Sequence, residues 1–327
     1  MRALSPSSLH FLPHAPGRHT RLALGFAVAL VITLFAIQQS IAAPRTVIDA
    51  RGRTVEIESA DRIVSIGGAV TEILYALGAG DRVIARDQTS LYPPEALGKP
   101  DVGYMRALSA ESVLSVKPDL ILAVEGSGPK EALDLLLAAS VPIVILPEPY
   151  SAKGIAEKIA MIADVIGEPE KGKALADGVE ARADALAAAI ATIPADKRRR
   201  AIFLMSSAGD RLMAAGHHTA ADAMLAAAGA VNPFGSVEGY KPASAEAMVA
   251  AAPQSIVMMS RPGADVPEAA KLFALPALAA TPAAADKSLI AMDGLYLLGF
   301  GPRMPDAARD LALALYPDLD IKAAPAP

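Results

Sequence analysis

The stretch Gly103-Tyr104-Met105-Arg106-Ala107-Leu108-Ser109-Ala110-Glu111 returns later, in altered form, as Gly239-Tyr240-Lys241-Pro242-Ala243-Ser244-Ala245-Glu246. In each copy a proline follows the glutamate after seven residues and leads into a short apolar run. Ser109 and Ser244 suit helix N-caps, because a serine oxygen accepts a hydrogen bond from a free N–H of the first turn. The glutamate then falls in that turn, where the helix dipole favours an anion. The repeat therefore predicts two similar lobes, each with a Gly-Tyr turn, a capped helix and a buried strand.

The composition excludes several classes of protein. The chain of 327 residues has no cysteine, which excludes disulfides, thiolate catalysis, zinc fingers, iron–sulfur clusters and the cysteine anchor of a lipoprotein. A net charge of -5 gives no case for nucleic-acid binding. Only 4% of the residues are aromatic and there is no tryptophan, so each tyrosine is a candidate for a specific role.

The N-terminal segment has the features of an export signal. Three arginines precede an apolar run from about residue 22 to residue 37. This run is short for a bilayer span, which needs roughly 20 residues. Ser40 and Ala42 have the small-residue spacing of a cleavage site. We therefore expect a signal peptide over 1–42 and a periplasmic protein that is not a lipoprotein, with an uncleaved anchor as the alternative.

Helices and strands alternate through 43–150, which predicts a first α/β lobe with a parallel sheet covered by helices. The segment 151–193 is long, helical and rich in alanine and charged residues, with an interruption at Gly167-Glu168-Pro169, and we expect it to link the lobes. A second α/β lobe is expected over 194–318 and a disordered tail over 319–327. The expected fold class is α/β, with two Rossmann-like lobes around central parallel sheets.

The pair of Tyr104 and Arg106 is the strongest candidate for ligand chemistry. A phenolate is a hard, charged oxygen donor suited to ferric iron, and tyrosine is an established type of haem ligand. A nearby guanidinium stabilises a phenolate, and the i, i+2 spacing on an extended loop places both side chains on one side. From the spacing alone, a packed loop tyrosine beside a solvated arginine is the favoured interpretation. Tyr92 and Tyr240 are then equal rivals.

Other chemistries have less support. His217-His218 directly precedes the expected cap Thr219, which favours a polar turn over a metal site that would need several histidines and carboxylates. Ser127 lacks both the Gly-x-Ser-x-Gly spacing of a hydrolase nucleophile and an evident histidine partner. We therefore expect no enzymatic activity, and an exported two-lobe α/β hydrolase is the alternative of another class.

With these motifs, the sequence resembles the periplasmic haem-binding proteins of bacterial haem ABC importers. They belong to the substrate-binding proteins that also serve vitamin B12 and ferric siderophores. The resemblance covers about residues 45–318, and it implies a class III periplasmic binding protein with haem in the cleft between two lobes joined by a single long, rigid interlobe helix. It rests on Val70-Thr71-Glu72-Ile73-Leu74-Tyr75-Ala76-Leu77-Gly78, on the stretch from Asp101 to Glu111, on Lys117-Pro118-Asp119-Leu120, on Ala214-Ala215-Gly216 with Thr219-Ala220-Ala221-Asp222-Ala223, and on Gly239-Tyr240-Lys241-Pro242.

The resemblance also implies roles for five residues. Tyr104 would be the axial ligand to ferric haem b, Arg106 would steady its phenolate, and Tyr240 would belong to the same haem site. Glu111 and Glu246 would dock onto the two subunits of an ABC permease that works with its ATPase. A donor such as an outer-membrane haem receptor would supply the haem. Within the same fold, a binding protein for cobalamin or a ferric siderophore stays open as the alternative.

One departure from the family affects the sixth iron ligand. Some relatives carry a haem-binding histidine where this chain has Ser206 and Ser207, so His217 or His218 would have to substitute. Four methionines are candidates for lining an apolar cleft, although ordinary core packing explains most of them. These candidates are Met205, Met213, Met258 and Met259. Three cationic residues are candidates for haem propionates: Arg211, Lys241 and Arg303.

Overall fold

The computed structural model describes residues 44–206, 212–263 and 266–321. The expected signal peptide over 1–42 lies outside the described residues, and so does most of the expected tail, from residue 322 onwards. No helix in the three described ranges combines the length and the apolar character that a bilayer crossing needs.

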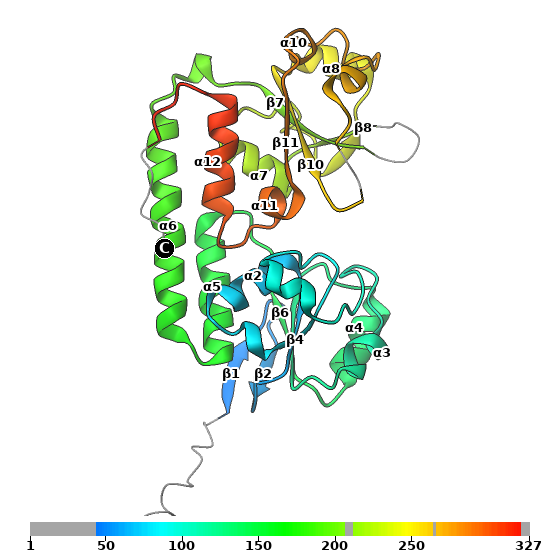
Figure 1. The fold of residues 1–327 in the computed structure, drawn as a ribbon, viewed down its shortest axis with the longest axis vertical. Helices are drawn as coiled ribbons and strands as arrows, with labels where there is room; N and C mark the ends of the chain where they lie inside the picture. The colour runs from blue at the N-terminus through cyan, green and yellow to red at the C-terminus, as the bar shows by residue number, and fades with distance from the viewer. Residues whose placement is uncertain (1–43, 207–211, 264–265, 322–327) are drawn as a thin grey trace, which may run out of the picture. The chain divides into compact units, whose positions relative to one another are not determined.

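The first lobe is a parallel sheet covered by helices, in agreement with the alternation in the sequence (Figure 1). Its elements are β1 (Arg45–Ile48), β2 (Thr54–Ile57), β3 (Ile63–Ile66), α2 (Gly68–Ala76), η1 (Gly80–Arg82), β4 (Val83–Arg86), η2 (Pro94–Gly98), α3 (Ala110–Ser115), β5 (Leu120–Val124), α4 (Lys130–Ala138) and β6 (Ile143–Leu146). The strand order of the main sheet is β4-β3-β5-β6, and its pairings are parallel, whereas β1 and β2 form a separate antiparallel hairpin. Because both faces of this sheet are covered, β3 and β5 are buried along their whole length.

Asp49 ties the β1–β2 hairpin to this sheet. Its carboxylate accepts the N–H groups of Arg51 and Arg53, both at 2.9 Å, and forms an ion pair with the Arg53 guanidinium. The N–H of Ile145 in β6 also donates to it, at 3.4 Å. Burial by itself raises the pKa of Asp49, but the hydrogen bonds and the charge of Arg53 outweigh it and lower this pKa.

We expect Asp49→Asn to lower the free energy of unfolding by about 1.5–3 kcal/mol, the usual range for a hydrogen bond to a charged group. The folded-state pKa lies below the unfolded value of about 3.9. The contribution of the carboxylate is therefore complete above about pH 4 and is lost as the pH falls through the folded-state pKa. Urea unfolding of both proteins at about pH 7 and about pH 3 should show a difference that narrows at the lower pH. A difference of equal size at both would contradict this role.

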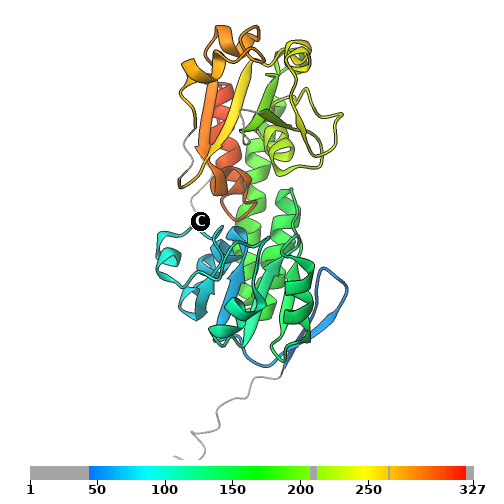
Figure 2. The same cartoon turned by 90° about the vertical axis from the view of Figure 1, so that its right-hand side faces the viewer.

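The segment 151–193 forms two helices, and one of them joins the lobes. α5 (Ala152–Ile166) ends at Gly167, whose φ of 78° is left-handed, and α6 (Pro169–Ala191) begins with a proline at its first position. α5 packs along α6 and also against β1 and α2, so it belongs to the first lobe. α6 continues to the second lobe and packs against α12 (Met304–Leu315), as Figures 1 and 2 show. The single interlobe helix of the expected fold is therefore α6 alone.

The second lobe has a mixed sheet. Its remaining elements are η3 (Ala195–Lys197), β7 (Ala201–Ser206), β8 (Leu212–Ala215), α7 (Ala220–Ala227), β9 (Tyr240–Pro242), α8 (Ala245–Ala251), β10 (Ser255–Ser260), α9 (Ala269–Phe273), α10 (Pro282–Ala285), β11 (Leu289–Asp293) and α11 (Gly294–Leu298). The strand order is β11-β10-β7-β8-β9. β11, β10 and β7 are parallel, as expected, whereas β8 and β9 add an antiparallel extension that the sequence did not predict. A run of four apolar residues such as β8 has no periodicity that separates strand from helix.

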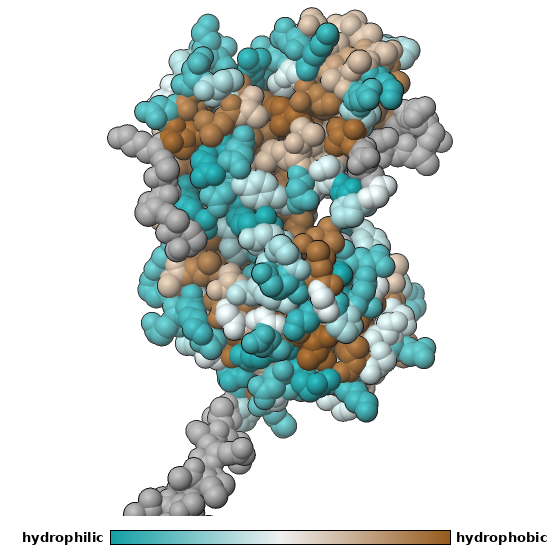
Figure 3. Space-filling model, viewed as in Figure 1, coloured by the Kyte–Doolittle hydropathy of each residue, from teal (hydrophilic) through white to brown (hydrophobic). Residues whose placement is uncertain are grey.

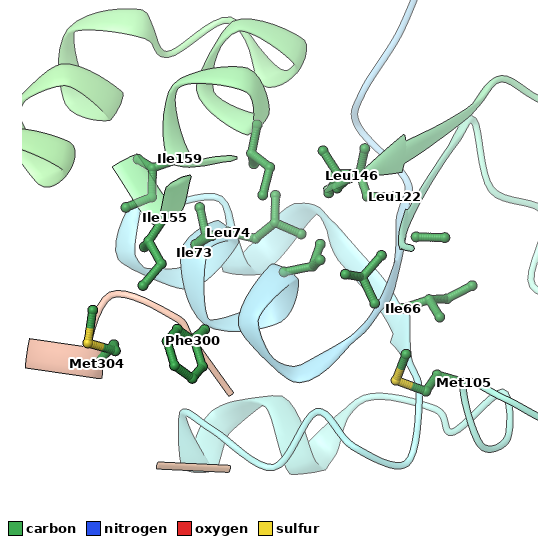
Figure 4. Close-up of a cluster of buried hydrophobic side chains, with 14 of the residues drawn as sticks. Ile66, Ile73, Leu74, Met105, Leu122, Leu146, Ile155, Ile159, Phe300 and Met304 are labelled. Carbon is green, nitrogen blue, oxygen red and sulfur yellow. The ribbon is translucent and has the colours of Figure 1, made fainter. Parts of the chain in front are cut away.

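The loop between α11 and α12 fixes the second lobe to the first. Phe300 in this loop is 1% exposed, and its ring packs edge-on against Tyr150 of the first lobe, with centroids 5.2 Å apart. Phe300 and Met304 belong to the same buried cluster as Ile73 in α2 and Ile155 in α5 (Figure 4). The hydrophobic core of the first lobe therefore continues into the second.

Arg303 adds a polar contact beside this apolar one. Its Nη2 donates to Glu72 Oε2 at 2.9 Å, and its backbone N–H donates to Glu72 Oε1 at 3.1 Å. The guanidinium carbon also lies 3.5 Å from the centroid of the Tyr92 ring, a cation–π geometry. Glu72 and Tyr92 belong to the first lobe, so these contacts cross the junction. We call Phe300 and Arg303 the interlobe anchor.

Candidate ligand-binding site

A cavity of about 990 Å³ lies between the two lobes and is lined by both. Figure 3 shows a gap between the lobes at the right-hand side of the view. On the first lobe its walls come from the segments that follow β3, β4, β5 and β6, and on the second from the ends of β7, β10 and β11. Ligands of open α/β sheets bind at this carboxyl edge of the parallel strands. The volume is at the upper end of the usual range for small-molecule sites, about 300–1,000 Å³.

Tyr104 and Arg106 lie together on the first-lobe wall of this cleft. Arg106 Nη1 donates to the phenol oxygen of Tyr104 at 3.2 Å. The loop is not extended here, contrary to the expectation from the sequence: the N–H of Ala107 donates to the Tyr104 carbonyl at 2.8 Å and closes a turn that brings the two side chains together. Met105 between them is 9% exposed, belongs to the core cluster of Figure 4 and also borders the cleft. The loop reaches this conformation through Gly103, whose φ of 106° favours glycine. The phenol of Tyr104 is therefore accessible to a ligand, with a cation beside it.

The other tyrosines of the cleft are less suited to bind iron. Tyr240 lines the second-lobe wall, half-buried, with its ring 6.4 Å from that of Phe203. Burial raises the pKa of Tyr240 and also that of Tyr150, and the charge of Glu148 raises the latter further. Both phenols therefore hold their protons more strongly than a free phenol. Tyr92 lines a separate cavity of about 270 Å³ beside Arg303, so this rival of Tyr104 lies outside the main cleft.

Sequence reasoning missed Tyr150 and Glu148 as cleft residues. Both follow β6, in the segment Pro147-Glu148-Pro149-Tyr150. Their position directly after a parallel strand could have identified them, because the carboxyl ends of parallel strands lie at the same edge of the sheet. The alternation of helices and strands expected through 43–150 already implied such strand ends.

The remaining candidates divide between the cleft and other places. His218 lines the cleft with a left-handed φ of 59°, and its ring lies 3.9 Å from that of His217, centroid to centroid. Of the four candidate methionines, Met205 and Met259 line the cleft, Met258 is buried in the core and Met213 does not line the cleft. Met105, which the sequence did not single out as a cleft methionine, also lines it.

The three residues that the sequence offered as partners of haem propionates lie in different places. Arg211 lies outside the described residues, Lys241 does not line the cleft, and Arg303 is paired with Glu72. Arg261, which the sequence did not single out, lines the cleft after β10. Within the described ranges there is no group of three or more His, Cys, Asp or Glu side chains that could hold a metal ion.

Glu111 and Glu246 lie where the repeat predicts them. Each is exposed in the first turn of a short helix, α3 in the first lobe and α8 in the second. The side chain of Ser109 accepts an N–H of α3 at 3.3 Å, and that of Ser244 accepts an N–H of α8 at 3.2 Å. Neither glutamate lines the cleft. Each lobe therefore presents one glutamate at the start of a capped helix.

The two α/β lobes, the single helix between them and the cleft at the carboxyl ends of their strands define a two-lobed ligand-binding protein. The family model described as "Periplasmic binding protein" matches residues 63–295. The chain belongs to the periplasmic binding protein family, and this confirms the resemblance found in the sequence.

Several solved structures are similar over most of the chain. The periplasmic heme-binding protein RhuT from Roseiflexus sp. RS-1 is 38% identical with a TM-score of 0.75, over 80% of this chain and 100% of that one. The periplasmic heme-binding protein BhuT, in complex with two hemes, is 36% identical with a TM-score of 0.73, over 78% and 98%. A periplasmic heme-binding protein from Pseudomonas aeruginosa is 33% identical with a TM-score of 0.74, over 80% and 95%. These relatives are binding proteins rather than enzymes.

The curated relatives match a shorter part of the chain. The vitamin B12-binding protein of Yersinia pestis (strain Pestoides F) is 33% identical over 124 residues, which is 38% of this chain and 44% of that protein. The match thus spans less than half the length of this relative. The proteins that this chain resembles are therefore named for two different ligands, heme and vitamin B12.

Proposed function

We propose that this protein captures ferric haem in the interlobe cleft, in the periplasm, and delivers it to an ABC permease of the inner membrane. The observation that carries the proposal is the accessible phenol of Tyr104, with the Arg106 guanidinium 3.2 Å from its oxygen. A phenolate is a hard anionic donor that suits ferric iron, and a neighbouring cation favours that form. The heme-binding relatives at 33–38% identity support the same ligand.

The walls of the cleft also suit a flat, largely apolar ligand with charged edges. Phe203, Met205 and Met259 present apolar surface to it from the second lobe. Such side chains pack well on an aromatic macrocycle, and methionine adapts its shape to the contact. Arg261, also at the cleft, supplies a guanidinium of the type that binds carboxylates. Apolar walls and a separate cation together fit a porphyrin that carries propionates.

Absorption titration of the purified mature protein with ferric haem tests the proposal. We expect saturation at one equivalent and a phenolate-to-iron charge-transfer band, because Tyr104 supplies the axial oxygen. The match to a vitamin B12-binding protein makes cobalamin the second candidate, and the same titration with cyanocobalamin examines it. Saturation by cyanocobalamin but not by haem would replace the first proposal with the second.

We further propose that Glu111 and Glu246 dock onto the permease. Each is exposed at the start of a capped helix, and hydrogen bonds with its own N–H and with Ser244 lower the pKa of Glu246, which keeps it an anion. Removing a charge from a docking contact weakens complementary pairing. We expect Glu111→Ala and Glu246→Ala each to slow haem delivery to the reconstituted permease and ATPase roughly tenfold, while haem binding stays unchanged.

Glu131→Ala is the matched control for these variants. Glu131 also lies exposed in the first turn of a helix of the first lobe, α4, but outside the repeated motif. We expect it to deliver haem at the wild-type rate. An equal loss with Glu131→Ala, or no loss with either variant of the repeat, would contradict the docking role.

A further inference from the structure

Lys158 in α5 is a fully buried lysine. Its side chain is 0% exposed, whereas the other lysines found in ion pairs are at least 57% exposed. Its Nζ lies 3.5 Å from Glu148 Oε1 and has no hydrogen-bond partner among the described residues. At that distance charge attraction, rather than a well-formed hydrogen bond, joins the pair. Removing an ammonium from water is energetically costly, so this position needs a compensating charge.

Two carboxylates supply that charge from different elements. Glu148 follows β6, and Glu72 lies in α2, where it is already paired with Arg303 of the interlobe anchor. Burial lowers the pKa of Lys158 and raises that of Glu148, and the charge of each group opposes the shift in the other. The ionised state of Glu148 therefore depends on the lysine behind it.

Glu148 connects this buried charge to the cleft, where it lines the wall together with Tyr104 and Arg106. The positive charge of Arg106 also favours the ionised form of Glu148. It lowers the pKa of Glu148, whereas burial raises this pKa. Glu125 is the other carboxylate nearby. The Glu125 carboxylate accepts a hydrogen bond from the N–H of Glu148 at 3.3 Å, and its negative charge raises the pKa of Glu148.

Arg106 needs such a partner because it is exposed on a loop. The one hydrogen bond of its side chain among the described residues goes to Tyr104. A free arginine side chain has many rotamers, and the loss of this freedom opposes any single placement of the guanidinium. A fixed anion in the same wall limits the positions that the guanidinium can take.

We propose that Lys158 is a positioning residue of the cargo site: it holds the Glu148 carboxylate in the cleft wall, where the negative charge of Glu148 acts through space on the Arg106 guanidinium beside Tyr104. Lys158 itself lies behind the wall and touches no cargo. The inference rests on the proposed haem function, because its effect is measured on bound haem. It assigns a role to the charges behind the cleft in addition to those that line it.

The test compares Lys158→Met with the double variant Lys158→Met/Glu148→Gln, in which neither charge remains. Lys153→Met is the control, because Lys153 lies in the same helix with its side chain 82% exposed. Thermal unfolding without ligand, ferric-haem titration and the position of the charge-transfer band are measured for each protein. Lys158→Met should be less stable than wild type, since it leaves the Glu148 charge without its partner, and the double variant should recover stability.

The two measurements on haem separate positioning from a purely structural role. We expect both Lys158 variants to bind haem roughly tenfold more weakly than wild type, with a shifted charge-transfer band, although the double variant is stable. A double variant with wild-type affinity and band would overturn the proposal, because stability alone would then explain the lysine. A wild type that binds no haem would overturn the proposed function as well. The unfolding data would then still show whether the two charges are coupled.

Discussion

Tyr104→Phe should bind ferric haem at least roughly 100-fold more weakly than wild type and should lose the phenolate-to-iron band. Substitutions that only disturb the partners of a metal ligand already cost about 10–100-fold in affinity, so loss of the ligand itself should exceed that. The ring remains in the variant, and Tyr104 is 39% exposed, so we expect little change in stability. Absorption titration and thermal unfolding of the same preparations measure the two effects.

Two further phenol deletions serve as controls for this result. Tyr92→Phe changes a residue outside the cleft, and Tyr240→Phe changes a buried phenol within it. We expect both variants to keep the band, because burial raises the pKa of Tyr240 and keeps its phenol protonated. If Tyr240→Phe loses the band while Tyr104→Phe keeps it, the assignment of the ligand passes to the second lobe.

Phe300→Ala should lower the free energy of unfolding by about 3–5 kcal/mol, the usual cost of deleting a buried aromatic ring. The ring is 1% exposed in the cluster that continues from the first lobe into the second, and Tyr150 packs against its edge. Its loss would leave a cavity at the junction of the lobes. Urea unfolding measures the loss, and hydrogen exchange of α11 and α12 shows whether the junction loosens.

Phe234→Ala is the matched control for the interlobe anchor. Phe234 is partly buried and packs within a cluster of the second lobe only. We expect it to cost less stability and to leave exchange at the junction unchanged. Equal effects of the two substitutions would contradict a special role of Phe300 between the lobes. The expected result would show that the anchor, together with α6, limits the motion of one lobe against the other.

The sequence by itself determined the features that depend on near neighbours. The caps at Ser109 and Ser244, the parallel strands from β3 to β6 and the break between α5 and α6 at Gly167 follow from residues a few positions apart. A capping oxygen reaches only the first turn of its own helix, and a buried strand is an apolar run between turns. Such patterns are visible without any distant contact, and the same holds for the spacing of Tyr104 and Arg106.

Only the tertiary structure decided which residues share the cleft. In the sequence Tyr92, Tyr104 and Tyr240 were equal candidates, and only the folded chain shows that Arg303 stacks on Tyr92 outside the cleft. Glu148, in the segment after β6, and Lys158 in α5 likewise form a pair only in the folded chain. Strands β8 and β9 depend on pairing with distant segments. These features rest on contacts between residues far apart in the chain, and no local pattern encodes such contacts because burial and pairing are set by the whole fold.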